Sequence, residues 1–225
     1  MPLQCLELFC GTKSVGKVFE RANWDVTSVD IVAKFNPTLC MSVLDIELDR
    51  WEPGHWDFIH ASVPCEAYSC AKTRGTRNTE MADMLSLHTV NLIKVLKPRF
   101  WTIENPASGM LKDRLWMRNL PYADASYCHY GFPYRKNTRF WSNLWEECDW
   151  RPKLCKKDCL SMWGTHHICS AQRGYLRPVV NYPHDRNFSL QELYRIPEPL
   201  IEAILEQVEQ IMLREANGDV EIAES

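Results

Sequence analysis

The stretch "LQCLELFCGTKSVGKVFERAN", residues 3 to 23, begins as an apolar strand that ends at a glycine and continues directly into a helix. Residues 24–31 and 57–64 have the composition of further short strands. Residues 81–97 have the apolar spacing of a helix, and 99–106 form another strand that runs into a proline turn. This alternation predicts an α/β fold, with a Rossmann-like, mixed but mostly parallel sheet and helices on both faces.

The amino-acid composition changes from about residue 142, where tryptophan, cysteine, lysine and proline become frequent and the periodic pattern of apolar residues ends. Periodicity returns in 197–216, where an i, i+3, i+4 stripe predicts an amphipathic helix on the core. The stripe consists of Leu200, Ile201, Ile204, Leu205, Val208, Ile211 and Met212. We therefore expect one main domain from 1–145 and 193–216, a small Cys/Trp-rich appendage at 146–192, and a disordered acidic tail at 217–225.

Composition limits the classes of protein that the chain can belong to. Its 225 residues are 45% hydrophobic, enough for the core of one domain. No apolar run approaches the roughly 20 residues of a membrane span, and the start of the chain does not resemble a signal peptide. We therefore expect a soluble, intracellular protein without membrane contact. In a reducing compartment, its ten cysteines would be thiols, metal ligands or a catalytic thiolate rather than disulfides.

The net charge of -3 gives no general attraction to nucleic acid, so any such contact must come from local basic clusters. Taken singly, such clusters are most often solvated surface. Three of them occur: Lys72, Arg74 and Arg77; Arg135, Lys136 and Arg139; Lys153, Lys156 and Lys157.

The first strand and its glycine indicate a nucleotide-type ligand. Gly11 would let backbone approach a ligand, and the helix after it would offer free amides. Asp30 ends the next strand, 19 residues after Gly11, where an acidic residue takes ribose hydroxyls in dinucleotide folds. Asp45 follows soon after, placed to reach an adenine amine. An adenosine-containing ligand is expected, while the lack of a full G-x-G-x-x-G argues against a plain nicotinamide enzyme.

Cys65 follows Pro64 directly after a buried strand. A buried structural thiol is the commoner role for such a cysteine. Here, however, the proline stiffens the backbone, and Lys72 and Arg74 would lower the pKa of the thiol. Glu104 ends a neighbouring strand 39 residues later, which places both side chains over the same edge of the sheet.

Four motifs, in order, resemble those of the S-adenosylmethionine-dependent cytosine-C5 methyltransferases. "LELFCGTKSVGKVFE" resembles the family's first motif, "DFIHASVPCEAYS" its proline-cysteine motif, "FWTIENP" its Glu-Asn motif and "YGFPYRKNTRFW" its arginine motif. "LYRIPEPLIEAIL" is similar to the proline and helix after the last motif, so the resemblance spans 3–145 and 193–206. It implies the class I methyltransferase fold, S-adenosylmethionine as cofactor and DNA as substrate and partner.

The resemblance also implies catalytic roles. Cys65 would add to cytosine C6 and make C5 nucleophilic, and Glu104 would hydrogen-bond N3 and the exocyclic amine. Asn105 would hold the cysteine loop. Arg139, with Arg135 as a second candidate, would support O2 of the base and orient Glu104. A base in a duplex would have to be flipped out, and the basic loop at 72–77 would hold the backbone around it.

The cofactor site is transferred in the same way. Its expected members are Phe9, Gly11, Thr12 and Ser14 at the methionine part, Asp30 at the ribose, Asp45 at the adenine amine, and the adjoining Ile31, Ile46 and Pro64. The alternative for Asp30 is a helix or turn cap.

The chain departs from the family pattern in several places. Lys13 stands where a second glycine is usual, and Tyr134 stands where the arginine motif begins with glutamine, with one extra residue before Arg139. Which basic residue meets the base therefore stays open. The target-recognition region is reduced to about 50 residues, and the Gly-Asn pair of the last motif is missing. Sequence specificity would then be short, relaxed or supplied by a partner.

The reduced region is rich in potential metal ligands, namely Cys148, Cys155, Cys159, His166, His167 and Cys169. Their spacing matches no standard zinc finger, so we predict no metal and reduced thiols packed among aromatic residues, with a structural zinc as the alternative. Three other functions stay open: the same reaction on RNA such as tRNA, a non-catalytic binding module with this fold, and a thiol-dependent enzyme acting on a free nucleotide.

Overall fold

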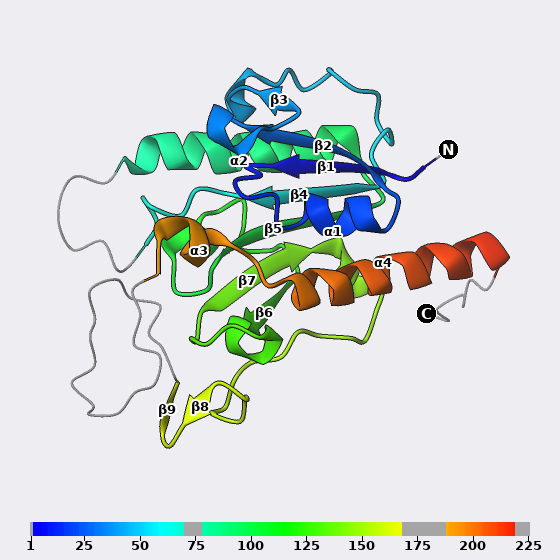
Figure 1. Ribbon diagram of the computed structural model, residues 1–225. Helices are drawn as coiled ribbons and strands as arrows, with labels where there is room; N and C mark the ends of the chain where they lie inside the picture. The colour runs from blue at the N-terminus through cyan, green and yellow to red at the C-terminus, as the bar shows by residue number, and fades with distance from the viewer. Residues whose placement is uncertain (1, 70–77, 168–187, 219–225) are drawn as a thin grey trace.

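A computed structural model of the chain describes residues 2–69, 78–167 and 188–218. Its centre is a seven-stranded sheet of order β3-β2-β1-β4-β5-β7-β6 (Figure 1). In that order the strands are β3 (Leu39–Cys40), β2 (Asp25–Asp30), β1 (Gln4–Leu8), β4 (Phe58–Ser62), β5 (Phe100–Pro106), β7 (Asn137–Ser142) and β6 (Tyr122–Ser126). The first five run parallel, and β7 lies antiparallel to both β5 and β6. The predicted mixed, mostly parallel α/β sheet is confirmed.

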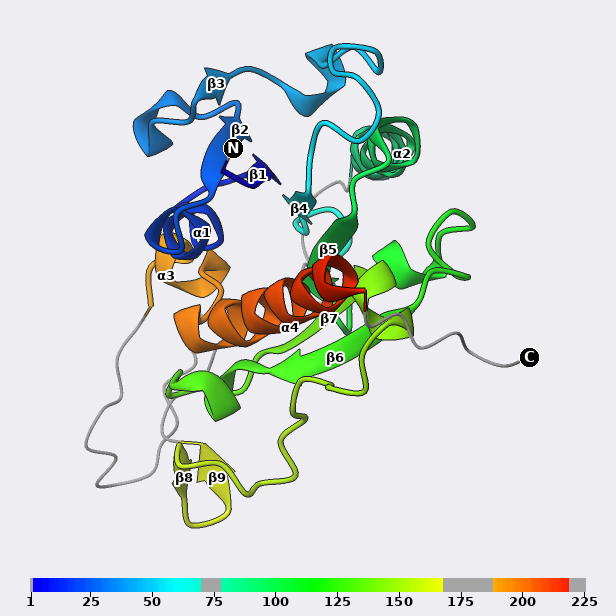
Figure 2. The same ribbon diagram turned by 90° about the vertical axis from the view of Figure 1, so that its right-hand side faces the viewer.

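Helices cover both faces of the sheet (Figure 2). The helices α1 (Gly16–Arg21) and α4 (Glu198–Asn217) contact each other on one face, and α2 (Thr79–Leu96) packs on the other. The shorter elements are α3 (Leu190–Tyr194), the 3-10 turns η1 (Ala33–Phe35), η2 (Val43–Asp45), η3 (Met110–Asp113), η4 (Tyr127–Tyr130) and η5 (Asn143–Glu146), and the hairpin strands β8 (Met162–Trp163) and β9 (His166–His167).

Strand side chains alternate between the two faces and so build two cores. Cys5, Phe58 and Phe100 pack against α1 and α4, whereas Leu6 and Ile59 pack against α2. The stripe predicted for α4 is confirmed. Its buried members are Leu200, Ile201, Ile204, Leu205, Val208 and Ile211, with Met212 packed partly buried beside them.

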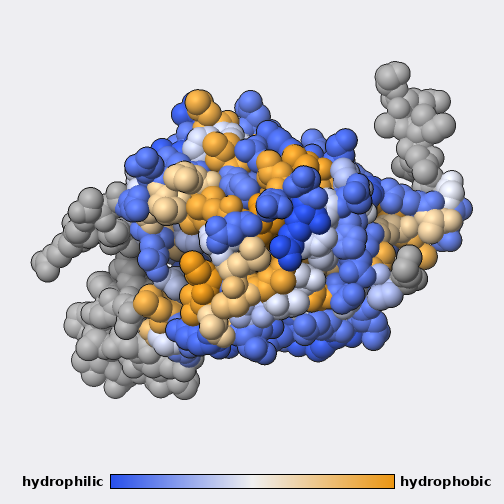
Figure 3. Space-filling model, turned by 90° about the horizontal axis from the view of Figure 1, so that it is seen from above, coloured by the Kyte–Doolittle hydropathy of each residue, from blue (hydrophilic) through white to orange (hydrophobic). Residues whose placement is uncertain are grey.

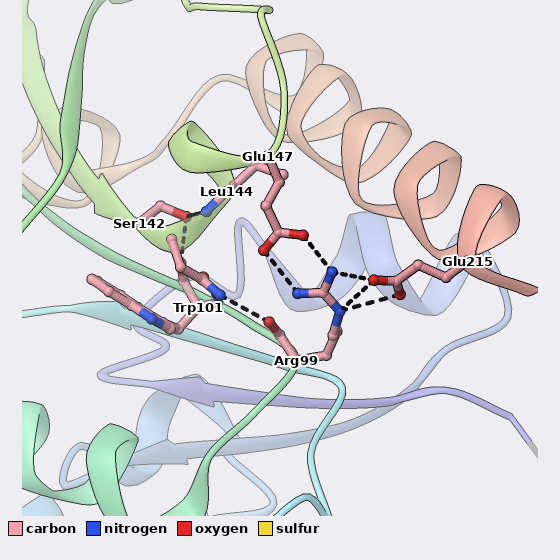
Figure 4. Close-up of polar contacts among 7 residues, drawn as sticks. Arg99, Trp101, Ser142, Leu144, Glu147 and Glu215 are labelled. Atoms are coloured by element: carbon pink, nitrogen blue, oxygen red, sulfur yellow. Dashed lines mark hydrogen bonds and ion pairs between the residues drawn. The ribbon is translucent and has the colours of Figure 1, made fainter. Parts of the chain in front are cut away.

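Arg99 anchors the far end of α4 to the sheet (Figure 4). It precedes β5, and its Nε donates to both carboxylate oxygens of Glu215 at 3.1 and 3.2 Å. Its Nη1 donates to Glu147 at 2.8 Å, next to η5. Nearby, the Ser142 hydroxyl donates to the carbonyl of Trp101 at 2.6 Å. One guanidinium thus joins β5, η5 and α4. Of the tail predicted to be disordered, Asn217 is the last residue of α4 and Gly218 is its C-cap, while residues 219–225 lie outside the described residues.

The hairpin of β8 and β9 lies beyond the β6 edge of the sheet, where the Cys/Trp-rich appendage was expected (Figure 1). Seen over β3 and α2, the surface of the main domain mixes hydrophobic with hydrophilic residues (Figure 3). None of the described helices is long and apolar enough to span a bilayer.

Candidate active site

One cavity of about 670 Å³ lies at the C-terminal ends of β1, β2, β4 and β5. Nine of the residues expected from the sequence line it: Phe9, Gly11, Thr12, Ser14, Asp30, Ile31, Pro64, Cys65 and Glu104. The carboxyl ends of parallel strands meet at the same edge of a sheet, and that is why segments far apart in the chain converge here. The expected cofactor site and the expected cysteine therefore share one cavity.

The loop after β1 has an unusual backbone that Asp30 holds in place. Phe9, Gly11 and Lys13 have φ values of 55°, 45° and 57°, in the left-handed region. The carboxylate of Asp30 accepts the amide of Gly11 at 2.9 Å and that of Val32 at 2.8 Å. A carboxylate offers about four acceptor sites, so the oxygens of Asp30 can still receive ribose hydroxyls. Lys13, where the family has glycine, bears a conformational cost of roughly 1–2 kcal/mol that glycine would avoid.

Glu7 is a cavity residue that the sequence analysis missed. It is buried in β1 and accepts the amide of Val15 at 3.1 Å. Burial is the main cause that raises the pKa of Glu7 to about 7. A Cβ on Gly16 would lie 2.6 Å from Oε2 of Glu7 and 3.2 Å from Cγ1 of Val26, so a larger residue at position 16 would require the Glu7 carboxylate to shift. The available signal was an acidic residue inside an otherwise apolar strand.

Two residues expected at the adenine are not in the cavity wall. Asp45 is exposed at the end of η2, and Ile46 is buried in the core beneath α2. The Ser42 hydroxyl accepts the amide of Leu44 at 3.2 Å and so fixes this turn. Because Ile46 points into the core, Asp45 is turned outward, and Ser42, Val43 and Leu44 line the cavity instead.

The Cys65 loop is held from two sides. Asn105 donates from Nδ2 to the carbonyl of Val63 at 2.8 Å, which is the positioning role expected of it. The amide of Tyr68 donates to the carbonyl of Cys65 at 3.0 Å. The buried hydroxyl of Tyr68 then donates to Asp83 at 2.7 Å, in α2. Cys65 is therefore fixed by contacts to β5 and to α2.

Burial raises the pKa of both Cys65 and Glu104. It is the largest cause that raises the pKa of Cys65 from 9.0 to about 11, the charge of Glu104 adds to the rise, and the Lys136 cation opposes it. Burial also raises the pKa of Glu104, against the effects of Lys136 and of the Tyr127 hydroxyl, which donates to Oε1 at 3.2 Å. A carboxyl that retains its proton can donate a hydrogen bond to a ring nitrogen.

Arg139, expected at the base, does not line the cavity. It lies opposite Asn105 in the register of β5 and β7. Its Nε and Nη2 donate to Asp124 of β6 at 2.7 and 3.0 Å, and its guanidinium lies 3.5 Å from the ring centroid of Tyr122. These contacts hold the side chain against the edge strand in the free protein, so the expected contact of Arg139 with the base stays a prediction.

Lys136, from the same basic cluster, lines the cavity instead. Its Nζ donates to the carbonyl of Leu193 at 2.8 Å and lies 4.9 Å from the ring centroid of Tyr127. The other candidate, Arg135, is exposed and donates to Asn137 at 3.1 Å. Lys136 is therefore the cation of this cluster that acts on Cys65 and Glu104.

The α3 segment closes one side of the cavity and was also missed. The Tyr194 hydroxyl donates to Glu66, next to Cys65, at 3.0 Å, and Leu190 and Gln191 line the wall. The Ser14 hydroxyl accepts the amide of Ile196 at 3.3 Å. Leu190 and Gln191, expected in the appendage, thus line the cavity. The signal was the capping box of Ser189 and Glu192.

The structure describes only some of the basic residues that were expected to contact nucleic acid. Lys153, Lys156 and Lys157 are exposed on the appendage. The loop with Lys72, Arg74 and Arg77 lies outside the described residues.

The raised pKa predicts slow alkylation of Cys65 in the free protein. Relative to a thiol of pKa 9.0, a pKa of about 11 leaves about a hundredfold less thiolate at pH 8. Iodoacetamide should therefore label Cys65 about a hundredfold more slowly than N-acetylcysteine, with a rate that keeps rising up to about pH 11. Mass spectrometry of the Cys65 peptide measures this rate. A plateau below pH 9 would contradict the prediction.

Comparison with known proteins adds to this geometry. No family model matches the chain. The chain is 28% identical over 182 residues to the "Probable DNA (cytosine-5)-methyltransferase" of Frog virus 3 (isolate Goorha), over 71% of this chain and 79% of the viral one.

Among solved structures, a protein described as a DNA modification methyltransferase, encoded within an E. coli prophage, is 20% identical, with a TM-score of 0.48 over 68% of this chain and 52% of its own. The Dnmt2 methyltransferase of S. pombe is 16% identical, with a TM-score of 0.46 over 70% of this chain and 53% of its own. The chain thus spans about half the length of each of these two structures. The similarity to the viral protein, which is named as a probable DNA cytosine-5 methyltransferase, confirms the resemblance that the sequence motifs indicated.

Proposed function

We propose that the chain transfers a methyl group from S-adenosylmethionine to C5 of cytosine in DNA. The observation that carries this proposal is the shared cavity, in which Cys65 and Glu104 face the loop held by Asp30. A thiol, a carboxyl whose pKa is raised by burial, and a nucleoside-type site in one cavity support transfer between a bound cofactor and a base.

The cavity suits S-adenosylmethionine in size and chemistry. Its volume of about 670 Å³ lies within the roughly 300–1,000 Å³ that ligand pockets occupy. Asp30 has acceptor capacity for the ribose, and Ile31, 71% exposed, offers an apolar surface for adenine. Thr12 and Ser14 also line the cavity, and their hydroxyls would face the amino-acid part of the cofactor. When bound, the cofactor would supply an electrophilic methyl group on a sulfonium.

The residues of the chain would activate the base. The thiolate of Cys65 would bond to C6, and the electrons of the C5–C6 double bond would become available at C5 for the methyl group. The carboxyl of Glu104 would donate to N3 and accept from the exocyclic amine, while Lys136 would stabilise the thiolate and the charge that develops in the ring. Loss of the C5 proton to solvent would then break the bond from sulfur to C6 and release Cys65.

DNA is the substrate that the proposal favours. The viral relative is named for activity on DNA. A cytosine in a duplex must leave the stack to enter such a cavity. Lys153, Lys156 and Lys157 are exposed cations of the kind that bind phosphates.

Covalent trapping tests the proposal. Oligonucleotides that carry 5-fluorocytosine, as DNA and as RNA, would be incubated with the protein and S-adenosylmethionine. Fluorine at C5 blocks the final elimination, so an adduct stable on a denaturing gel is expected with DNA. An adduct with RNA alone would move the proposal to RNA. An absence of adducts, together with no cofactor binding in calorimetry, would favour a non-catalytic module, and activity on free dCMP would favour a nucleotide enzyme.

A further inference from the structure

Four buried side chains converge outside the cavity, where the appendage meets the sheet. They are Cys128, Cys155, Cys159 and His167, and their potential ligand atoms all lie within 4.8 Å of one another. Cys128 belongs to η4, directly after β6, whereas the other three come from the appendage and its hairpin. The three cysteines are free thiols in the structure.

The arrangement has the chemistry and the dimensions of a closed zinc site. Three sulfurs and one imidazole form a ligand set of structural zinc sites. Zn–S bonds of about 2.3 Å and Zn–N bonds of about 2.0–2.1 Å at tetrahedral angles place sulfur and nitrogen about 3.6 Å apart. Sγ of Cys155 and Nε2 of His167 are 3.4 Å apart. Small shifts of the other side chains would complete a tetrahedron.

The backbone around the cluster supports a bound metal. The amide of Lys157 donates to Sγ of Cys155 at 3.3 Å, in a turn where Lys157 has a φ of 71°. Ser126 of β6 holds the same turn from the sheet: its hydroxyl accepts the amide of Cys155 at 3.0 Å, and its amide donates to the carbonyl of Lys153 at 2.9 Å. The ligands are thus held in place by their surroundings, as in sites where a second layer of contacts orients the ligands.

The packing of the appendage gives a physical reason for a metal. Among the described residues, the core around Cys128, Cys155 and Cys159 gains a single partly buried hydrophobic residue, Met162. Small units without a sufficient apolar core are usually stabilised by disulfides or metals. Reduced thiols alone would leave the hairpin with little to hold it against η4.

A second possible ligand group, His129, Cys155 and Asp158, shares one cysteine with the first. It has only three members, Asp158 is exposed, and His129 Nε2 already lies 3.2 Å from Asp158 Oδ1. The remaining candidates from the sequence do not join either group. Cys148 packs on the α4 side of the sheet and His166 is exposed, while Cys169 lies outside the described residues.

We propose that Cys128, Cys155, Cys159 and His167 bind one structural Zn²⁺ that fixes the appendage to the catalytic domain. The four protein ligands fill a tetrahedral site, so the metal would have no open position for a substrate. The proposal takes the alternative of the sequence analysis, a structural zinc, in place of its prediction of no metal. Spacing could not reveal the site, because Cys128 stands 27 residues before Cys155 and outside the cysteine-rich segment.

Metal analysis of the full chain tests this site independently of methyl transfer. Protein purified without chelators and dialysed is expected to contain one zinc per chain by plasma mass spectrometry. Cys128→Ser and Cys159→Ser should lower the zinc content at least about tenfold. Cys148→Ser, a matched substitution in the same segment, should retain one zinc, as should Asp158→Asn and His129→Gln.

Cobalt provides a second readout that needs no variant. Replacement of zinc by Co²⁺ in the wild-type chain should give the intense visible bands of tetrahedral Co²⁺ and a thiolate charge-transfer band, saturating at one equivalent. Wild-type protein with neither zinc nor these bands would overturn the proposal and leave four packed, reduced side chains. Zinc retained by Cys128→Ser would also overturn it, and zinc lost from Asp158→Asn would assign the metal to the other group.

Discussion

Replacement of Cys65 by alanine is expected to lower methyl transfer to cytosine by about a thousandfold or more. The thiol is the one group in the proposed reaction that bonds to the base, and C5 is too weak a nucleophile without that bond. The loop itself should survive, because Asn105 holds the carbonyl of Val63 and Tyr68 holds the backbone on the other side of Cys65. Transfer of a radioactive methyl group to oligonucleotides measures the rate.

The comparison variant is Cys40→Ala, which removes an exposed thiol at the end of β3. Its rate should stay within about twofold of wild type, because the thiol is exposed and its contact with the carbonyl of Ile31, at 3.9 Å, is long and weak. S-adenosylmethionine binding, measured by calorimetry, should be retained in both variants. A Cys65→Ala protein that binds the cofactor and methylates at the wild-type rate would remove the covalent step from the proposal.

The fold could be predicted to the extent that local patterns mirror it. The sequence analysis predicted β1, β2, β4 and β5 and the helices α2 and α4, whereas the two-residue strand β3 was not predicted. By contrast, β6 and β7 contain polar residues such as Asp124 and Arg139, which satisfy each other across the strands. Because these charged residues occur within the strands, the two segments lack a continuous apolar pattern that would predict a strand.

The site could be predicted where the topology alone brings residues together. Asp30, Cys65 and Glu104 lie at or near the C-terminal ends of parallel strands. These ends lie at the same edge of the sheet, regardless of the conformation of the loops that follow them. The residues that failed depend on finer geometry. Asp45 was turned outward by the burial of its neighbour, Ile46, and Glu7 lies close to Gly16 of α1.

The arginine motif, which includes most of β7, also could not be interpreted from the sequence alone. Side chains alternate along β7, so a one-residue difference in spacing moves a basic side chain to the other face of the sheet. The extra residue before Arg139 has this effect: Phe140 lies opposite Glu104, and Arg139 lies opposite Asp124 of the edge strand. A sequence motif alone does not show on which face of a strand each of its side chains lies. The assignment of Lys136 therefore depends on the three-dimensional arrangement.

Substitution of Lys136 by methionine should consequently lower kcat about a hundredfold, the usual cost of removing one group that stabilises developing charge. Methionine keeps the length of the side chain and removes its cation. Because Lys136 opposes the rise in pKa of both Cys65 and Glu104, both pKa values should rise further without it. The pH at which kcat/KM increases should then move upward in the variant. Lys136→Arg should restore part of the rate, since it restores the charge.

Arg139→Met is the matched substitution on the other face of β7. It breaks the ion pair with Asp124 and the contact with Tyr122, so a lower melting temperature is expected. Its kcat per folded chain, however, should fall less than about tenfold, because Arg139 lies outside the cavity and can affect the reaction only indirectly, through the structure of the sheet. If Arg139→Met instead loses a hundredfold in kcat while Lys136→Met does not, then the arginine motif acts as in the family, and the side chain must move to the base when DNA binds. The two variants, compared at equal cofactor saturation, thus decide which cation faces the cytosine.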